Sequence, residues 1–548
     1  MKAFKFVSTI LFFSLIMGCS GSDPSGASLS AGQAQGAKSY LVSHYAASRF
    51  AEQASMGPSP DLVDEIRRKG FEAWIDEQFA LPPTQFPKLP NFYLDTPDDK
   101  TYVRDQFLNL AVLSQDQLRI KTVWSLSQFL VISQGKISGV ATLHWINLLF
   151  QKAFTDYGTL LTSVSTSPAM GWYLDNFQNR PKSPECTWCQ ANENFARELM
   201  ELFSIGTTLI NLDGSPKRDP RGAKINTYSQ QDVEAMARAL TGWEWIKDEL
   251  YGNEWTDWSK PMGVSSNAFE HDWGSKTLLG KQIPSGQSAQ QDLNSVIQIL
   301  MSHENTAPFV ATRLIQHFVK SNPSSAYVQR VSKVFNSENN GQKGDLRKVI
   351  KAILLDPEAR QGDDPSKLWP NDGKYKEPVL FQTQTWRGLG CRKFPSNVKG
   401  ISNFGSDQSP FMPETVFSFY SPHGRASGSN LPAPEQKLIN AQEFQRRMNM
   451  AGNLQWNQNA ANDPDSSLLS LQDAGCEIDA LNQLYSKSIE IYLDFISTRF
   501  FRGSMPASLR RELKTMNDNI SAYEWVPTRR ALHLMQYALI SPYFGIIK

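Results

Sequence analysis

The sequence lacks the short motifs by which common enzyme classes are recognised. No Gly-x-Ser-x-Gly turn and no Gly-x-Gly-x-x-Gly loop occurs in it. Gly280-Lys281 is not a phosphate-binding loop, because Gln282 stands where Ser or Thr must hold magnesium. The seven histidines include no His-Glu-x-x-His pair, so a metal site would need ligands from distant segments. We therefore predict no metal site, and the sequence names no cofactor.

Strong net charge is also missing. The chain has 55 Lys and Arg residues against 54 Asp and Glu, a formal net charge of +1. This balance excludes the basic footprint of a nucleic-acid-binding protein and a polybasic lipid-binding patch. Beyond the N-terminus, the longest apolar stretches are broken by Gln, Lys or Arg. We expect neither a nucleic-acid partner nor a later transmembrane helix.

The N-terminus has the layout of a signal peptide. Lys2 and Lys5 come first, and an apolar run over residues 6–17 follows. Gly18 then precedes Cys19, as a small residue precedes a cleavage site. The run is shorter than the roughly 20 apolar residues that cross a bilayer. We predict that residues 1–18 are removed after export.

Residues 16–19, Ile-Met-Gly-Cys, resemble the lipobox of bacterial lipoproteins. The resemblance implies that Cys19 carries lipid and anchors the chain on a membrane, and two or three acyl chains anchor stably. Ser20 stands where Asp would retain such a protein at the inner membrane, so an outer-membrane position facing periplasm or surface is expected. The alternative is an ordinary secretory signal with an accidental cysteine. Residues 19–38 are rich in Gly, Ser, Ala and Gln and predict a flexible tether.

Four cysteines remain besides Cys19, namely Cys186, Cys189, Cys391 and Cys476. An even number in an exported chain favours two disulfides, with three pairings possible. Cys186 and Cys189 can instead be redox-active, or supply half of a zinc site. No His follows Cys189, which excludes attachment of a c-type haem.

Helical periodicity dominates the rest of the chain. Apolar residues recur at helical spacing in many segments, including residues 61–79, 102–132, 192–205 and 528–540. Alternating strand patterns are scarce, and no repeat of fixed period occurs. We predict a mostly α fold with long Pro/Gly-rich loops and little strand. Residues 39–548 are expected to form one large helical domain, with two lobes that can meet near residues 250–290.

Residues 193–206 carry the clearest helical pattern in the sequence. Asn192 is a plausible N-cap and Gly206 a plausible C-terminal stop of a helix there. Glu193, Arg197 and Glu201 recur every four residues, with Glu198 beside them. Periodicity favours a solvated ladder of ion pairs. The alternative is a pocket network in which Glu198 or Glu201 acts as a general base beside Arg197.

A second candidate segment runs from residue 271 to residue 280. His271, Asp272 and Lys276 lie within six residues, in a loop bounded by Gly. Such a group can bind an anion or a metal. Local hydrogen bonds that hold the loop in place are the alternative, which we favour. His303 and His317 lie beside apolar helix faces and are interpreted as core histidines.

The chain resembles bacterial exported proteins of the "domain of unknown function 1800" family. The strongest match is the block at residues 193–206. Further matching stretches are residues 47–58, 70–79, 228–243, 271–280, 307–316, 321–323, 352–360, 376–378 and 541–544. Many members carry a Trp-His-Asn-His-Phe stretch, but here His144-Trp145-Ile146-Asn147 stands nearby without that pattern. No metal role is therefore carried over to it.

The resemblance identifies no reaction. It implies an exported protein that works beside a sulfatase-like exported partner, with a role on polysaccharide or in a surface assembly. Our leading hypothesis is a lipid-anchored envelope protein that binds a partner protein or a glycan, because 14 Trp and 16 Tyr can line a sugar-stacking groove. One rival is a hydrolase-like enzyme that uses Glu198 or Glu201 with Arg197, His271 and Asp272. The other is a structural scaffold for the sulfatase-like partner.

Overall fold

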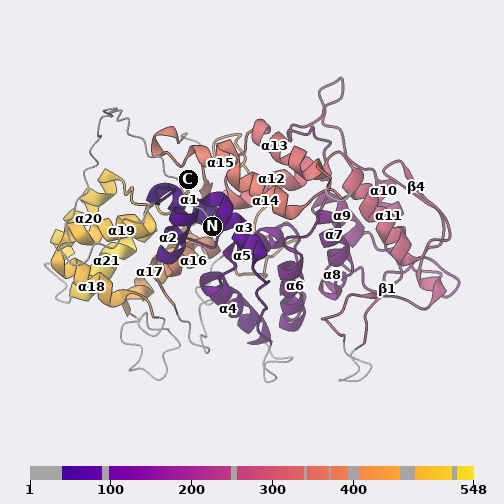
Figure 1. The fold of residues 1–548 in the computed structure, drawn as a ribbon. Coiled ribbons are helices and arrows are strands. Elements are labelled where there is room, and N and C mark those ends of the chain that lie inside the picture. Colours follow the sequence, from indigo (N-terminus) through magenta and orange to yellow (C-terminus); the bar gives the residue numbers. More distant parts are fainter. Residues whose placement is uncertain are drawn as a thin grey trace, which may run out of the picture. The chain divides into compact units, whose positions relative to one another are not determined.

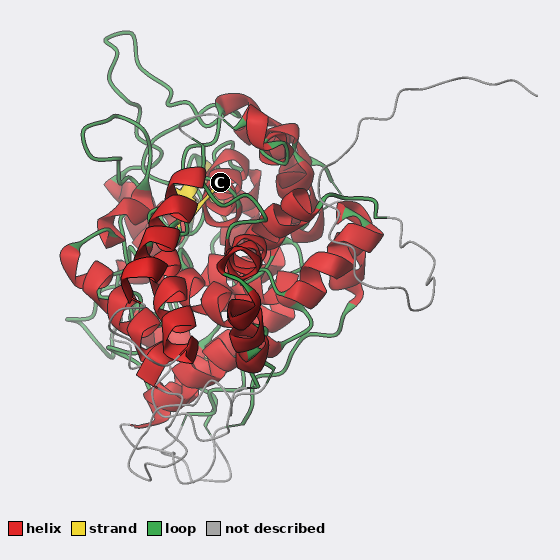
Figure 2. Cartoon of the chain, turned by 90° about the vertical axis from the view of Figure 1, so that its left-hand side faces the viewer, coloured by secondary structure: helices red, strands yellow, loops and turns green. Residues whose placement is uncertain are grey.

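The computed structural model describes residues 40–88, 98–247, 256–338, 342–368, 372–392, 407–456, 475–520 and 527–548. In these ranges the chain is mostly helical, which confirms the predicted fold class (Figure 2). None of the helices described there has the length and apolar character needed to cross a bilayer. The predicted signal peptide, Cys19 and the tether lie outside the described residues.

Ten helices up to residue 239 form the first part of the described body (Figure 1). They are α1 (His44–Ala54), α2 (Pro60–Lys69), α3 (Phe71–Ala80), α4 (Asp98–Leu113), α5 (Gln117–Ser127), α6 (Gly139–Lys152), α7 (Tyr157–Ser165), α8 (Pro168–Tyr173), α9 (Asn194–Glu201) and α10 (Gln230–Ala239). Among them, α1 packs on α2, α4 on α6, and α9 on α10.

The helices after residue 280 complete the body. They are α11 (Ala289–Ser302), α12 (Thr306–Phe318), α13 (Ser325–Asn336), α14 (Leu346–Leu355), α15 (Pro357–Gln361), α16 (Pro378–Gly388), α17 (Ala441–Trp456), α18 (Ile478–Lys487), α19 (Ile489–Phe500), α20 (Ala507–Ile520) and α21 (Pro527–Ile540). α12 packs on α13 and on α5, while α21 contacts α17, α18, α19 and α20. Figure 1 shows these last five helices gathered together in orange and yellow.

Strands are short throughout the described ranges, where they form three antiparallel two-stranded pairs. The pairs are β1 (Trp243–Glu244) with β2 (Gly263–Val264), β3 (Lys276–Leu278) with β4 (Lys281–Ile283), and β5 (Lys374–Tyr375) with β6 (Ile546–Ile547). The last pair ties the C-terminus to the segment before α16, and β6 also contacts α1.

Buried apolar side chains form two clusters. The larger cluster takes residues from α1 through α16, from residues 411–438 and from β6. The second gathers residues of α16 to α21 with Val112. Met262, Leu278 and Ile283 belong to the larger cluster, so the segment at residues 250–290 contributes to that core where it is described.

Capping side chains explain where several helices begin. Ser229 and Asp232 form a reciprocal capping box at the start of α10, and Ser288 and Gln291 do so at α11. α5 is buried on every side, including Lys121. A helix that is buried all round carries no amphipathic pattern, so its neighbours in space, not its periodicity, determine its place.

Two expected helices have different bounds in the structure. The periodic stretch at residues 102–132 is divided between α4 and α5, and Asp116 in the break accepts hydrogen bonds from Thr84. The helix expected at residues 192–205 is shorter, spanning Asn194–Glu201. Asn192 does not act as its N-cap, because its side chain accepts no hydrogen bond from the second or third residue of the helix. Its side chain instead accepts from the Asn194 N–H in a local turn.

Candidate functional site

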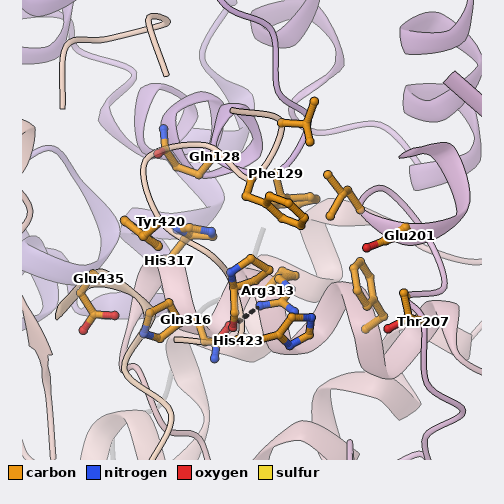
Figure 3. A pocket seen from close by; sticks show the side chains of 17 residues that line it. Gln128, Phe129, Glu201, Thr207, Arg313, Gln316, His317, Tyr420, His423 and Glu435 are labelled. Carbon is orange, nitrogen blue, oxygen red and sulfur yellow. Dashed lines mark hydrogen bonds between the residues drawn. The ribbon is translucent and has the colours of Figure 1, made fainter. Parts of the chain in front are cut away.

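A narrow pocket lies where α5, α9, α12 and the loop at residues 407–435 meet (Figure 3). The space open to the centres of water molecules in it is about 50 Å³, enough for roughly four waters. Its apolar walls are Phe129, Leu202, Phe309, Val416 and Phe417. Its polar lining is Gln128, Glu201, Thr207, Arg313, Gln316, His317, Tyr420, His423 and Glu435.

One face of α12 supplies the centre of the pocket. Arg313, Gln316 and His317 are spaced i, i+3 and i+4, which places them side by side on the helix. Figure 3 shows Arg313 in the middle, with Glu201 and Thr207 on one side and Tyr420 and Glu435 on the other. The pocket is thus built on a rigid element.

Gly206 allows the close approach that forms the α9 side of the pocket. Its φ is +67°, in the left-handed region that favours glycine. A Cβ at this position would lie 3.0 Å from the ring of Phe309. The sequence-based prediction of a stop at Gly206 therefore falls on a residue that the pocket wall also needs.

The loop at residues 407–435 closes the pocket from the other side and is tied to the end of α5. Ser418 donates to the side-chain oxygen of Gln128 over 3.2 Å. Ser133 donates to the Pro413 carbonyl over 2.7 Å, and the Gln134 N–H donates to the Phe411 carbonyl over 2.9 Å. These bonds hold the loop against the end of α5 and the segment that follows it.

Arg313 is the principal positive group of the pocket. Its Nη1 donates to Gln316 Oε1 over 3.1 Å and to the Pro422 carbonyl over 3.2 Å (Figure 3). Burial lowers the pKa of Arg313 to about 10, which leaves it charged at neutral pH. Among the described residues it makes no ion pair, and its recorded hydrogen bonds use Nη1 alone.

Both histidines of the pocket are neutral at neutral pH. Burial lowers the pKa of His317 to about 3, and the nearby Lys374 lowers it further. The His317 ring stacks on Phe129, with centroids 6.1 Å apart. Burial and the Arg313 charge also lower the pKa of His423, against the opposing effect of Glu201. Neither histidine competes with Arg313 as a positive charge.

A buried ionic cluster holds the pocket together from behind. Lys374 Nζ lies 2.8 Å from Glu377 Oε1 and also donates to the Gln316 carbonyl at the end of α12. Glu377 accepts from Gln408 and interacts with the Tyr420 hydroxyl. Burial and Lys374 lower the pKa of Lys121 to about 7. We refer to Lys121, His317, Lys374, Glu377 and Tyr420 as the Glu377 cluster.

The carboxylates predicted on α9 have different environments. Glu201 lines the pocket and accepts from the Tyr228 hydroxyl over 2.9 Å. Glu198 is half-buried, and burial together with the charge of Glu201 raises its pKa to about 7. Arg197 bonds instead to Glu193 over 2.9 Å and to Gln230. The helix therefore combines an exposed ion pair, at Glu193 and Arg197, with one carboxylate in the pocket.

His271 and Asp272 belong to a separate group of residues. His271 is buried, with Nδ1 3.0 Å from the Thr241 carbonyl and Nε2 3.4 Å from Asp292. Arg238 forms a two-pronged pair with Asp272 at 2.6 and 2.9 Å.

Lys276 completes this second group, with Nζ 2.5 Å from Asp292. Together, the bonds of Asp272 and Lys276 join the loop and β3 to Arg238 of α10 and to Asp292 of α11. No cluster of His, Cys, Asp and Glu able to hold a metal ion occurs in the part of the chain that the structure describes.

The four cysteines pair as two disulfides, Cys186–Cys189 and Cys391–Cys476. The first closes a surface loop that exposes Trp188. The second joins the segment after α16 to the segment before α18. The prediction of two disulfides is confirmed, and the sequence had left their pairing open.

The sequence did not single out most of the pocket. Arg313 and Gln316 lie in the matching stretch at residues 307–316, to which the sequence assigns no role, and the pocket residues between 416 and 435 lie in none of the matching stretches. A useful signal was present in the Arg-Leu-Ile-Gln-His run of α12, where three polar residues share a face of an otherwise buried helix. The residues across the pocket from that face come from the end of α5, from α9 and from the loop at residues 407–435, all distant from α12 in the sequence.

The fold and pocket define a mostly helical protein with a small, apolar-walled pocket whose charged lining residues are Arg313, Glu201 and Glu435. The family model described as "Protein of unknown function (DUF1800)" matches residues 49–546, so the chain belongs to this family. No curated protein and no solved structure matches the chain.

Proposed function

We propose that the protein is anchored to the cell envelope through lipid on Cys19 and binds a carboxylate group of an envelope glycan in the Arg313 pocket. The observation that carries the binding proposal is the partly buried Arg313 guanidinium, which lines the pocket and forms no ion pair with any carboxylate of the described residues. A desolvated cation is costly unless it is paired, so an anionic ligand is its natural counter-ion.

The geometry of the pocket favours a carboxylate over a larger group. A guanidinium presents planar donors that match the two oxygens of a carboxylate. The free space of about 50 Å³ admits a group of a few atoms and excludes a whole sugar ring. Gln316, Thr207 and Glu201 can accept or donate to hydroxyls that flank the acid, which favours an acidic sugar at the end of a glycan.

Binding can be tested with glucuronate as the probe and glucose as the neutral control. A ligand that binds only the native state stabilises it by RT ln(1 + L/Kd), where L is the free ligand concentration, and so raises the melting temperature. We expect millimolar glucuronate to raise the melting temperature of the wild type at constant ionic strength, and glucose to have no effect. The Arg313→Gln variant should lose this response.

The matched control is Arg221→Gln, because Arg221 is an exposed arginine outside the pocket. This variant should keep the full response to glucuronate. An equal response in the Arg313→Gln variant, or none in the wild type, would rule out carboxylate binding at this pocket.

The anchor is supported by the lipobox resemblance and by the disulfides, since stable disulfides form in exported proteins. We expect Cys19→Ala to move the protein from the membrane fraction to the soluble fraction after cell lysis. Immunoblots of the two fractions measure this change. Retention of Cys19→Ala on membranes in high salt would show that another part of the chain holds it there.

An envelope hydrolase is the second candidate function, favoured by the split between Glu198 and Glu201. Glu198 has a pKa of about 7 and can donate a proton, while Glu201 at the pocket wall can accept one. Products formed from a bound glycan, and lost in Glu201→Gln, would favour this candidate. The sulfatase-like partner is part of the proposal only as an exported neighbour that acts on the same glycan.

A further inference from the structure

A second groove, lined by other residues, runs between α6, the end of α7 and the segments at residues 82–88 and 258–261. Its volume is about 660 Å³, within the range of sites that hold ligands of several rings. None of the residues lining the Arg313 pocket lines this groove. Because the groove differs from the Arg313 pocket in volume and in lining residues, the two are separate candidate sites.

Trp258 lines one side of the groove and is backed by a group of aromatic rings. Its indole contacts Trp245, with ring centroids 5.6 Å apart. Trp245 stacks on Phe177 at 3.5 Å and also contacts Trp172 at 5.1 Å. These rings hold the Trp258 indole in place before any ligand arrives. A fixed indole face suits the C–H face of a sugar ring, because its negative π surface attracts the weakly positive hydrogens.

Neutral hydrogen-bonding groups line the rest of the groove. Asn147 and Gln151 of α6 supply amides, and Ser163 and Ser259 supply hydroxyls. Asn147 Oδ1 accepts from the Phe86 N–H over 3.1 Å, and no hydrogen bond of its Nδ2 is recorded with the described residues. Amides and hydroxyls around an aromatic face are the groups that recognise sugar hydroxyls, since they both donate and accept.

The charge of the groove has one sign. Lys88, Lys152 and Lys260 line it, and none of its lining residues is Asp or Glu. Lys260 is paired with Asp257 at 3.0 Å, whereas Lys88 and Lys152 form no ion pair with the described residues. A ligand that follows this groove meets two ammonium groups that have no ion-pair partner among the described residues, which favours anionic over neutral chains.

We propose that this groove binds an acidic oligosaccharide, with one sugar ring on Trp258 and its carboxylate or sulfate groups beside Lys88 and Lys152. The proposed ligand is of the same broad class as that of the Arg313 pocket. The two sites share no residue, so either proposal can fail alone.

The test is calorimetric titration of the purified protein with hexagalacturonate, a chondroitin sulfate hexasaccharide and neutral cellohexaose. We expect at least one acidic hexamer to bind, and cellohexaose to bind at least tenfold more weakly. Trp258→Ala should weaken the acidic hexamer about tenfold, the loss expected for one stacked ring. The double variant Lys88→Ala/Lys152→Ala should bind more weakly and with a smaller dependence on salt.

Two matched controls lie outside the groove, Trp188→Ala at an exposed tryptophan and Lys281→Ala at an exposed lysine. Both should bind as the wild type does, as should Arg313→Gln. Circular dichroism melts confirm that each variant is folded. The proposal is overturned if no acidic hexamer binds, if cellohexaose binds equally well, or if Trp258→Ala binds undiminished. If glucuronate still raises the melting temperature of the wild type, and this response is lost in Arg313→Gln, the proposal for the Arg313 pocket stands by itself.

Discussion

Replacing Glu377 by leucine is expected to lower the free energy of unfolding by about 3–5 kcal/mol. Glu377 and Lys374 are each 1% exposed, and their charged atoms lie 2.8 Å apart. Removal of the carboxylate leaves Lys374 buried beside Lys121 without a counter-ion. A buried charge that loses its partner costs far more than the net value of the pair. Urea unfolding at pH 7 measures the change.

The same residue predicts how stability depends on acid. Burial acts to raise the pKa of Glu377, but Lys374, His317 and the bond from Gln408 outweigh it and lower the pKa to about 2. Because the folded pKa is depressed, the contribution of Glu377 is present above pH 4.5 and is lost as the pH falls towards 2. Glu377→Leu should therefore lose less stability than the wild type over this range.

Two further variants separate burial from charge. The double variant Glu377→Leu/Lys374→Met should recover part of the loss, since neither charge is then left alone. Glu304→Gln breaks an exposed pair with Lys217 and should cost less than about 1 kcal/mol. If Glu377→Leu costs no more than Glu304→Gln, the Glu377 cluster does not hold the pocket segments together.

The Glu377 cluster also shows which parts of the fold the sequence could predict. Amphipathic helices carry their own signal, so the mostly α class and many helix positions follow from periodicity. α5 carries no such signal, because all of its residues are buried, and Lys121 would be placed on a solvated face by its type alone. The charged groups that act on Lys121 are Lys374 and Glu377, which lie some 250 positions later in the chain.

The pocket was hidden for the same reason. Glu201 could be named as a candidate from the spacing on α9, but its partners in the pocket come from α5, α12 and the loop at residues 407–435. No local pattern connects these segments. His271, Asp272 and Lys276 are close in the sequence, yet the His271 ring lies 3.4 Å from the carboxylate of Asp292, which belongs to α11. Local spacing predicts neighbours on one element and is silent on those that a fold brings together.

Removal of the Cys391–Cys476 disulfide is the second large effect that we expect. The bond joins residues 85 positions apart. Closing a loop of this length in the unfolded chain corresponds to about 4–5 kcal/mol by the chain-entropy relation. Cys391 is also buried in the second apolar cluster, which packs α16 against α19 and α21. The double variant Cys391→Ala/Cys476→Ala should therefore unfold at a much lower urea concentration.

The other disulfide supplies an internal control, because Cys186 and Cys189 are only three positions apart. By the same relation, its removal should cost about 2 kcal/mol. Wild-type protein treated with a strong reductant should lose about as much stability as the double variants Cys391→Ala/Cys476→Ala and Cys186→Ala/Cys189→Ala lose together. Equal losses in the two double variants would mean that loop length does not govern the effect. If the reduced wild type is as stable as the oxidised protein, the disulfides do not stabilise the fold. They would then no longer support folding in an oxidising compartment, and one argument for export would be lost.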